Sequence, residues 1–260
     1  MNMDEMKKLW LSEEESAHIH GWDFSRLDGR FYTGDDDLPW DYRQLILDRI
    51  SPEMRILDID TGGGEFLLSL GHPYSMTAAA EGYPPNVELC REKLIPLGID
   101  FREWHEGTPL PFDDESFDMV IDRHGSYTPS EIWRVLKKGG IFITQQVGGD
   151  NDRELADFLC PDRDNRYSGH YLAPELEKFK AQGFTIADSG ECYRPIEFYD
   201  TGALVWFARV IPWEFPDFSV ENSFDRLCKA HEIIERNGCI SGNIHRFMIT
   251  AVKQAGGIES

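Results

Sequence analysis

The sequence predicts an α/β fold, with a mostly parallel sheet and helices on both of its faces. From Arg55 onward, short apolar runs alternate with helical segments, which is the pattern of successive βαβ units. The chain has 260 residues, of which 41% are hydrophobic, and this is enough apolar material for a sizeable core. We expect residues 51–260 to form the main domain, with cap elements in its C-terminal part, and residues 1–50 to form a helical and aromatic extension.

Five strands are expected in the first part of the main domain, over residues 55–59, 76–80, 101–104, 119–122 and 141–145. Helices are expected between them, over residues 65–70, 85–97 and 129–137. The Lys138-Gly139-Gly140 turn should end the last of these helices, because glycine adopts the left-handed conformation that commonly closes a helix.

The two flanks follow a less regular pattern. Roughly the first 20 residues are predicted to be helical. Residues 21–43 are predicted to be an ordered connector packed by its aromatic side chains. After residue 150 the expected helices are 152–158, 173–182 and 223–237, and the expected strands are 184–188 and 244–252. The apolar run 203–211 fits either a helix or a strand.

The net charge of −21 bears on the partners that the chain can have. Binding to nucleic acid requires basic side chains that neutralise phosphates. The densest basic group, Arg134, Lys137 and Lys138, looks like the exposed end of a helix. The charge therefore argues against DNA or RNA and favours a small-molecule partner. The oligomeric state stays open.

Cysteine usage and hydropathy point to the cytoplasm. The five cysteines are widely spaced and form no CxxC pair, so we expect neither a disulfide framework nor a metal site. The longest apolar runs, such as 203–211, are far shorter than a membrane span, so no span is expected. Residues 1–10 include two acidic and two basic side chains and no apolar signal-peptide core.

A glycine-rich turn follows the first predicted strand, in the run Ile56-Leu57-Asp58-Ile59-Asp60-Thr61-Gly62-Gly63-Gly64-Glu65-Phe66. Glycines let the backbone approach a ligand, and the next helix presents free N–H groups at its start. Such turns also serve nicotinamide, flavin and purely structural roles. Glu81 ends the second predicted strand, where an acidic side chain in this architecture accepts hydrogen bonds from ribose hydroxyls.

Two further segments follow in order. The first contains Leu110-Pro111-Phe112 and Ser116-Phe117-Asp118, and the second is Arg134-Val135-Leu136-Lys137-Lys138-Gly139-Gly140. With the glycine turn, these segments make residues 55–145 resemble the class I S-adenosylmethionine-dependent methyltransferases, particularly the ubiquinone- and menaquinone-type branch. The resemblance implies a Rossmann-like fold with N- and C-terminal additions, S-adenosylmethionine as cofactor, and methyl transfer to an acceptor that the sequence does not identify.

The resemblance also implies which residues bind the cofactor. Asp58 would order the loop and the methionine ammonium, and Gly62 and Gly64 would contact the methionyl and ribose parts. Glu81 would bind the ribose, and Gly82 and Tyr83 would border the adenine.

The remaining positions that match the family lie after the third and fourth predicted strands. Glu106 would lie near the adenine amino group, with Gly107 supplying a backbone N–H. Asp122 and Arg123 would lie beside the methyl donor.

Asp60 departs from the family pattern, which usually has glycine at this position of the loop. Aspartate tolerates a positive φ better than most residues, so the turn can survive. Its side chain could still crowd the cofactor or add a carboxylate beside the ammonium. Two alternatives therefore stay open. One is a non-catalytic protein that binds S-adenosylmethionine. The other is an NAD(P)-dependent oxidoreductase, which would explain neither segment 104–120 nor the Gly139-Gly140 turn.

His124 and Tyr127 are the candidate catalytic residues. They follow the fourth predicted strand, and in this architecture ligands bind outside the carboxyl ends of the strands. We expect His124 to face the acceptor cavity and either orient the acceptor or take its proton. The alternative for His124 is local packing or a hydrogen bond within the turn.

Overall fold

The computed structural model describes residues 2–18, 24–161 and 167–254, and these form two compact units built from interleaved segments. The first unit contains the described residues of Met1–Leu38, Gly148–Gly169 and Cys192–His245. The second unit contains Pro39–Val147, His170–Glu191 and the described residues from Arg246 onward. Residues 19–23, which include the start of the predicted connector, lie outside the described residues.

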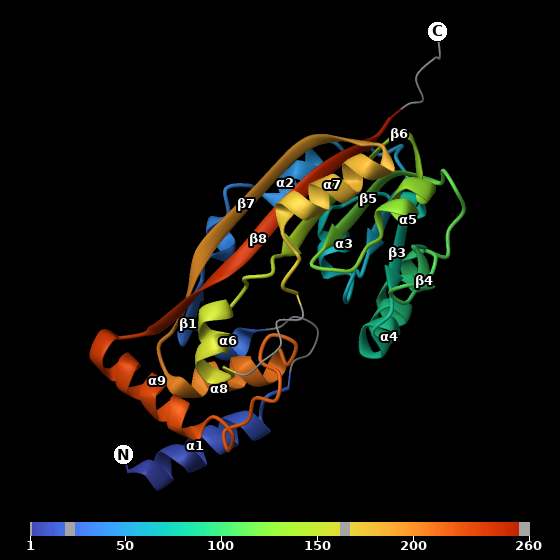
Figure 1. Cartoon of the computed structure of the whole chain (residues 1–260). Coiled ribbons are helices and arrows are strands. Elements are labelled where there is room, and N and C mark those ends of the chain that lie inside the picture. Colours follow the sequence, from blue (N-terminus) through green and yellow to red (C-terminus); the bar gives the residue numbers. More distant parts are fainter. Residues whose placement is uncertain (1, 19–23, 162–166, 255–260) are drawn as a thin grey trace. The chain divides into compact units, whose positions relative to one another are not determined.

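The second unit is built on a mostly parallel sheet, as predicted (Figure 1). Its strands β6, β5, β2, β3 and β4 lie side by side in that order, and each neighbouring pair is parallel. Their bounds are β2 Ile56–Ile59, β3 Thr77–Glu81, β4 Asp100–Glu103, β5 Phe117–Arg123 and β6 Leu136–Val147. Beyond β6 follow β8 (Ile240–Lys253), which is antiparallel to β6, and then β7 (Phe184–Phe198).

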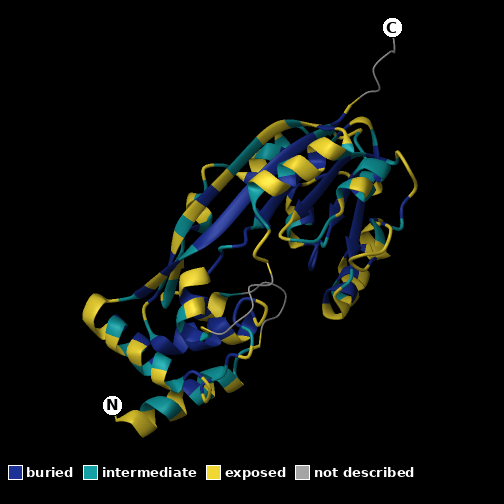
Figure 2. Ribbon diagram, in the orientation of Figure 1, coloured by how far each residue is buried: buried dark blue, intermediate teal, exposed yellow. Residues whose placement is uncertain are grey.

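Helices cover both faces of this sheet because apolar side chains alternate along its strands. In β2, Leu57 packs with α5 (Pro129–Val135) and α7 (Leu172–Gln182). Its neighbour Ile56 packs on the opposite face with α2 (Tyr42–Leu47), α3 (Glu65–Ser69) and α4 (Pro84–Lys93). Two short 3-10 helices, Tyr74–Met76 and Ile95–Leu97, lie in the connections. Figure 2 shows the central strands as the most continuously buried part of this unit.

The first unit has its own helical core. It contains α1 (Met3–Glu15), α6 (Arg153–Leu159), α8 (Thr201–Val210) and α9 (Phe224–Asn237). Two 3-10 helices (Ser25–Leu27 and Gly34–Asp37) and β1 (Phe31–Thr33), which pairs with the end of β7, complete it.

The apolar run 203–211, which fitted a helix or a strand, is mostly helix α8. Its first turn is capped by Asp200, whose carboxylate accepts a hydrogen bond from Ala203 N at 2.8 Å.

The structure differs from the predictions at several places, including the division into units, the lengths of two strands and one turn. The division between units falls at 38/39 and not at residue 50, and the first unit also takes in segments from the second half of the chain. Strands β7 and β8 are longer than the predicted 184–188 and 244–252. The turn at Gly139 does not end a helix: α5 stops at Val135, and residues 136–140 already belong to β6.

Gly139 serves a bulge in β6. It has φ +79°, and the pairing between β5 and β6 shifts register beside it, from Phe117↔Leu136 to Met119↔Ile141. The extra residues on β6 between these pairs need a left-handed backbone position, which glycine adopts without strain. The sequence pattern therefore identified a left-handed glycine correctly, but this glycine lies in a bulge of β6 and does not end a helix.

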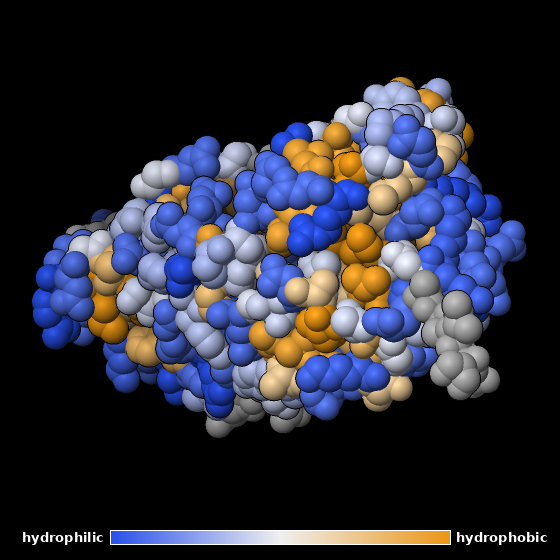
Figure 3. Space-filling view, turned by 90° about the horizontal axis from the view of Figure 1, so that it is seen from above, coloured by the Kyte–Doolittle hydropathy of each residue, from blue (hydrophilic) through white to orange (hydrophobic). Residues whose placement is uncertain are grey.

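The face shown in Figure 3 is mostly hydrophilic, with separate apolar areas between the polar side chains. Among the residues that the structure describes, no helix is long and apolar enough to cross a membrane.

Candidate active site

The loop after β2 is a tight left-handed turn. Asp60, Gly62 and Gly64 have φ values of +51°, +64° and +81°. Asp60 thus adopts the conformation that the glycine pattern requires, as predicted. At Gly64 a side chain would also collide with the core, because an added Cβ would lie 2.7 Å from Leu94 Cδ2. Within the turn, the Thr61 hydroxyl donates to the buried Asp58 carboxylate at 2.6 Å.

Glu81, at the end of β3, is tied to this turn. One carboxylate oxygen accepts from Gly62 N at 2.8 Å and from Asn86 Nδ2 at 3.3 Å. The other accepts from Gly82 N and Tyr83 N, both at 2.8 Å. Glu81 is only 4% exposed, so its carboxylate links the loop after β2 to the loop after β3. A ribose hydroxyl would have to share or replace one of these hydrogen bonds.

The loops after β3 and β4 lie against each other. An added Cβ at Gly82 would lie 2.1 Å from the carbonyl oxygen of Trp104, so only glycine permits this approach. Tyr83 is 63% exposed beside it, and Glu106 and Gly107 lie in the exposed turn that follows Trp104. The four residues predicted to border the adenine therefore come from adjacent loops at one edge of the sheet.

The loop after β5 meets the turn after β2. Asp60 accepts a hydrogen bond from Ser126 N at 2.7 Å. An added Cβ at Gly125 would lie 2.8 Å from Asp60 Oδ2 and 2.9 Å from Asp122 Oδ2. Those two carboxylate oxygens therefore flank the same small space beside Gly125.

Asp122 is fully buried, and among the described residues only one of its two carboxylate oxygens accepts hydrogen bonds. Its Oδ1 accepts from Gln146 Nε2 at 2.5 Å, from Thr144 Oγ1 at 3.2 Å and from Gly125 N at 3.3 Å. Its Oδ2 has no hydrogen-bond partner among the described residues. A buried oxygen of this kind indicates a missing partner, since most such atoms in folded proteins are paired.

The carboxylates of this site form no ion pair among the described residues, and the charge of Arg123 lowers the pKa of Asp58 only in part. Burial raises the pKa of Asp58 to about 7, against a hydrogen bond from Thr61 that lowers it, and the charges of Asp60 and Glu81 raise it further. Burial also raises the pKa of Asp60 to about 6. Asp122 has its pKa raised well above the ordinary value by burial and by the two neighbouring aspartates. The arrangement therefore favours a ligand that brings positive charge.

Arg123 makes no ion pair with this cluster among the described residues, although its charge acts on Asp58. Its exposed guanidinium lies over the Phe66 ring at 5.6 Å, and Phe66 packs on Tyr42. Among the residues that the structure describes, no group of three or more His, Cys, Asp or Glu side chains is arranged to hold a metal ion.

The two candidate catalytic residues lie in different surroundings. His124 is exposed, has φ +62°, and its Nε2 lies 3.1 Å from Gln145 Nε2. Tyr127 packs its ring on Phe142 and Phe179, and its hydroxyl donates to Glu175 at 3.1 Å. Burial raises the pKa of Tyr127 well above its ordinary value, and the Glu175 charge adds to this. These contacts favour a packing role for Tyr127, and its catalytic role stays a prediction.

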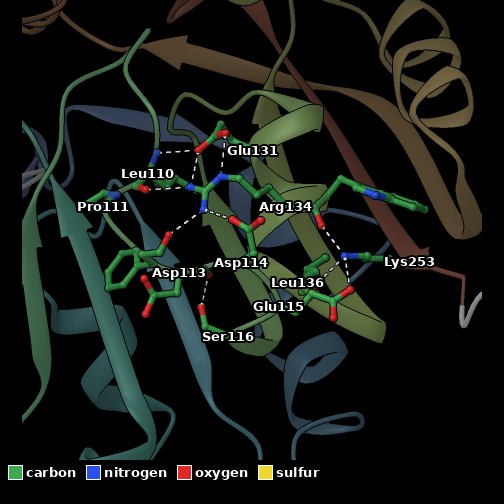
Figure 4. Close-up of polar contacts among 12 residues, drawn as sticks. Leu110, Pro111, Asp113, Asp114, Glu115, Ser116, Glu131, Arg134, Leu136 and Lys253 are labelled. Carbon is green, nitrogen blue, oxygen red and sulfur yellow. Dashed lines mark hydrogen bonds and ion pairs between the residues drawn. The ribbon is translucent and has the colours of Figure 1, made fainter.

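The two further motif segments are joined by one side chain (Figure 4). Arg134 uses all five guanidinium N–H groups, on Glu131, Asp114 and the carbonyl oxygens of Leu110 and Phe112, at 2.7–3.0 Å. Lys137 pairs with Asp118 at 2.7 Å. Two of the three side chains in the densest basic group are therefore already neutralised within the fold.

Several polar residues of the site were not singled out from the sequence. Trp40 Nε1 donates to Gln145 Oε1 at 2.8 Å, and the Tyr42 hydroxyl donates to the Asp122 carbonyl at 2.9 Å. The available signal was the pair Gln145-Gln146, two consecutive amides at the end of an otherwise apolar strand. Buried amides at such a place imply a polar network.

Fold and site together define the class of protein. A doubly wound α/β sheet with a glycine turn after one strand, and an acidic side chain ending the next, binds its ligand at the carboxyl ends of the strands. Within this class, residues 57–144 match a family model described as a methyltransferase domain. This match confirms the resemblance to the methyltransferases noted in the motifs.

Individual relatives cover only part of the chain. The phthiotriol/phenolphthiotriol dimycocerosates methyltransferase of Mycobacterium tuberculosis is 34% identical over 98 residues, which are 35% of this chain and 36% of that protein. The demethylmenaquinone methyltransferase of Thermus thermophilus is 32% identical over 117 residues, or 41% of this chain and 53% of that protein. The match thus spans between 36% and 53% of the length of these two relatives.

A solved structure extends the similarity in fold beyond the matched segment. YcgJ from Bacillus subtilis superposes with a TM-score of 0.56 at 21% identity, covering 83% of this chain and 99% of that chain. At this identity the similarity concerns the fold alone.

Proposed function

We propose that this protein transfers a methyl group from S-adenosylmethionine to a small-molecule acceptor. The observation on which the proposal depends is the cluster of Asp58, Asp60 and Asp122, whose buried carboxyl groups have raised pKa values and form no ion pair within the described part of the chain. S-adenosylmethionine brings an ammonium and a sulfonium, so its charge matches what the cluster lacks. The unpaired Oδ2 of Asp122 supports the same ligand chemistry.

The residues at the carboxyl ends of four strands would hold the cofactor. Asp58 and Asp60 would face its ammonium from the turn after β2, and Glu81 would accept hydrogen bonds from its ribose. Tyr83 would offer an aromatic surface to the adenine, with Glu106 and Gly107 as polar partners on the next loop. Asp122 and Arg123 would border the methyl donor from the end of β5. The tight backbone packing at Gly82 and Gly125 supports this assignment, because a side chain at either position would collide with the neighbouring loop.

The bound cofactor would supply an electrophilic methyl on a positively charged sulfur. The chain would contribute alignment and exclusion of water, which are the main requirements of a direct displacement. A general base is needed only where the acceptor arrives protonated. Small acceptors are favoured because the charge of −21 repels polyanions. The two relatives named above are called methyltransferases of phthiotriol/phenolphthiotriol dimycocerosates and of demethylmenaquinone, which supports an organic small molecule as acceptor. The expected cytoplasmic location stays a prediction.

Calorimetry with S-adenosylmethionine, S-adenosylhomocysteine and NAD tests the proposal. We expect both adenosyl ligands to bind and NAD not to bind. Binding of NAD alone would favour the oxidoreductase, and affinity for none of the three would refute a cofactor site at these loops.

A non-catalytic protein that binds S-adenosylmethionine is the second candidate, and Asp60 is the observation that favours it. Its side chain occupies the loop where the family usually has glycine, and it is held there by Ser126 N. Asp60→Gly should retain or tighten cofactor affinity if the carboxylate merely crowds the site. Loss of affinity in this variant would mean that Asp60 makes a needed contact. Release of S-adenosylhomocysteine with a broad panel of acceptors distinguishes the two candidates, since a non-catalytic protein releases none.

A further inference from the structure

A chain of two hydrogen bonds links Trp40, Gln145 and His124, all within the second unit. Trp40 immediately precedes Asp41, the residue that caps α2. Its indole Nε1 lies 2.8 Å from Gln145 Oε1, and Gln145 Nε2 lies 3.1 Å from His124 Nε2. Gln145 lies on β6 and is only 3% exposed, so its contacts with Trp40 and His124 determine how its amide is oriented.

The donor chemistry fixes the direction of both hydrogen bonds. An indole N–H can only donate, so the Gln145 oxygen must face Trp40. The Gln145 NH₂ group then faces His124, and an NH₂ group can only donate. His124 Nε2 must therefore be the acceptor, which requires a neutral imidazole with its proton on Nδ1.

Two further features hold His124 in this state. Its backbone N donates to the Gln145 carbonyl at 2.8 Å, so main chain and side chain are both anchored to β6. Although the residue as a whole is exposed, the protein packed around its ring lowers the pKa of His124 well below its ordinary value, and the charges of Arg246 and Arg123 add to this. The Nδ1–H group has no hydrogen-bond partner among the described residues, although the residue reaches solvent.

We propose that Trp40 and Gln145 are positioning residues that hold His124 as a neutral Nδ1–H donor, which orients the acceptor through an oxygen lone pair and does not take its proton. The acceptor would then be a small molecule with a carbonyl, hydroxyl, ether or carboxylate oxygen near the atom that is methylated. The role in acceptor binding rests on the proposed function. The tautomer itself does not.

Nitrogen NMR of the histidine ring tests the tautomer without an acceptor. In the native protein at pH 7, the His124 signals should be those of a neutral ring protonated at Nδ1. In Trp40→Phe the amide loses the donor that orients it, so both tautomers should appear. Trp206→Phe is the matched control, since it removes another buried indole N–H and should leave the His124 spectrum unchanged.

Gln145→Glu should move the proton of His124 to the other ring nitrogen. A carboxylate can only accept, so His124 should become protonated at Nε2. Should this buried carboxylate prevent folding, Trp40→Phe keeps the test decisive. A native spectrum with a charged His124, or with the proton on Nε2, overturns the inference.

Two substitutions at His124 then test its role toward the acceptor. Asparagine places its NH₂ close to the position of Nδ1 and tolerates a positive φ, whereas glutamine extends toward the position of Nε2. With hydroxyaryl and carboxylic acid acceptors, His124→Gln should release S-adenosylhomocysteine about 2- to 10-fold more slowly than His124→Asn, the loss expected for one hydrogen bond. Equal or faster release by His124→Gln would overturn the donor role.

The results separate this inference from the proposed function. If calorimetry detects no S-adenosylmethionine binding while His124 is protonated at Nδ1, the proposed function and the acceptor role fail, and the assignment of Trp40 and Gln145 stands. If the cofactor binds while His124 carries its proton on Nε2, the inference fails and the proposed function stands.

Discussion

At the scale of single residues, the site depends on carboxylates that need a cation. Asp58 and Asp60 have pKa values of about 7 and about 6 because burial disfavours their charged forms. A cationic ligand binds better to the ionised groups. Protonation and ligand binding therefore compete at these two side chains.

We expect the affinity for S-adenosylmethionine to rise between pH 5 and pH 8 and to level off above, as the two aspartates ionise. Asp60→Asn should flatten the part of this rise near pH 6, since it removes that ionisation with little change in volume. Calorimetry across the pH range measures both. An affinity that is constant or falls with pH would show that these carboxylates do not face the ligand.

Glu81 should be essential to the same loops. Glu81→Ala removes a carboxylate that accepts from three backbone amides, and should weaken S-adenosylmethionine binding by ~1–3 kcal/mol. Glu103→Ala is the control, because Glu103 is the register partner of Glu81 on β4 and is exposed. If the two variants bind equally well, the assigned role of Glu81 is wrong.

At the scale of elements, Arg134 connects α5 to the loop before β5. It joins two motif segments that resemble the family and lie far from the glycine turn in sequence. Its role in the structure is to fix the loop 110–114 rather than to bind a ligand.

Arg134→Ala should lower the free energy of unfolding by ~1–3 kcal/mol, because the Leu110 and Phe112 carbonyls and Glu131 lose charged donors. Arg134→Lys should recover only part of this loss, since an ammonium cannot reproduce the planar arrangement of donors. Arg91→Ala, which breaks exposed ion pairs with Glu88 and Glu103, is the control and should cost less than ~1 kcal/mol. Chemical denaturation of the three variants measures the differences.

How well the sequence predicts a helix or strand depends on whether the residues of that element alone carry the pattern that identifies it. The strands β2, β3 and β5 have buried apolar runs and sit between clear turns, so they were predicted within a few residues. Strand β7 was predicted only at its start, because Asp188 to Glu191 break the apolar alternation. Strand β7 is hydrogen-bonded to its neighbour β8, and no local pattern reveals such a neighbour.

The features of the site also fall into two kinds, those that motif spacing predicts and those that only the folded structure reveals. The tolerance of a positive φ at Asp60 and the place of Glu81 at the end of β3 follow from motif spacing, whereas the hydrogen bond between Glu81 and the glycine turn does not. The link from Trp40 to Gln145 joins positions 105 residues apart, and hydrogen-bond direction is decided only when both side chains meet. The catalytic role of His124 stays a prediction, and the sequence left the protonation state of its ring open.

At the scale of the whole molecule, the buried acids couple stability to pH. The folded-state pKa values of Asp58 and Asp60, about 7 and about 6, lie above the ~3.9 of an unfolded aspartate. Between about pH 4 and pH 7 the folded protein therefore binds more protons than the unfolded chain. Their contribution is fully present below pH 4 and is lost as the pH rises through 6 and 7.

The thermal midpoint of the ligand-free protein should consequently fall between pH 5 and pH 8, and Asp60→Asn should show a smaller fall. Saturating S-adenosylmethionine should raise the midpoint more at pH 8 than at pH 5, because the ionised acids then have a cationic partner. Glu175 affects stability in the opposite pH direction. Burial would raise its pKa, but His170 and Lys178 lower it to about 2. Its contribution to the free energy of unfolding is therefore lost in strong acid. A midpoint that rises from pH 5 to pH 8 would contradict the raised pKa values.

The position of β8 has a consequence for biosynthesis. Among the described strands it is the last along the chain, yet it lies between β7 and β6. On the ribosome, β6 therefore leaves the exit tunnel long before its antiparallel partner has been made. Until Ile240–Lys253 arrives, the open edge of β6 presents unpaired N–H and C=O groups that another nascent chain could pair with. Slow translation or crowded polysomes should therefore harm the yield of this protein more than its final stability would suggest.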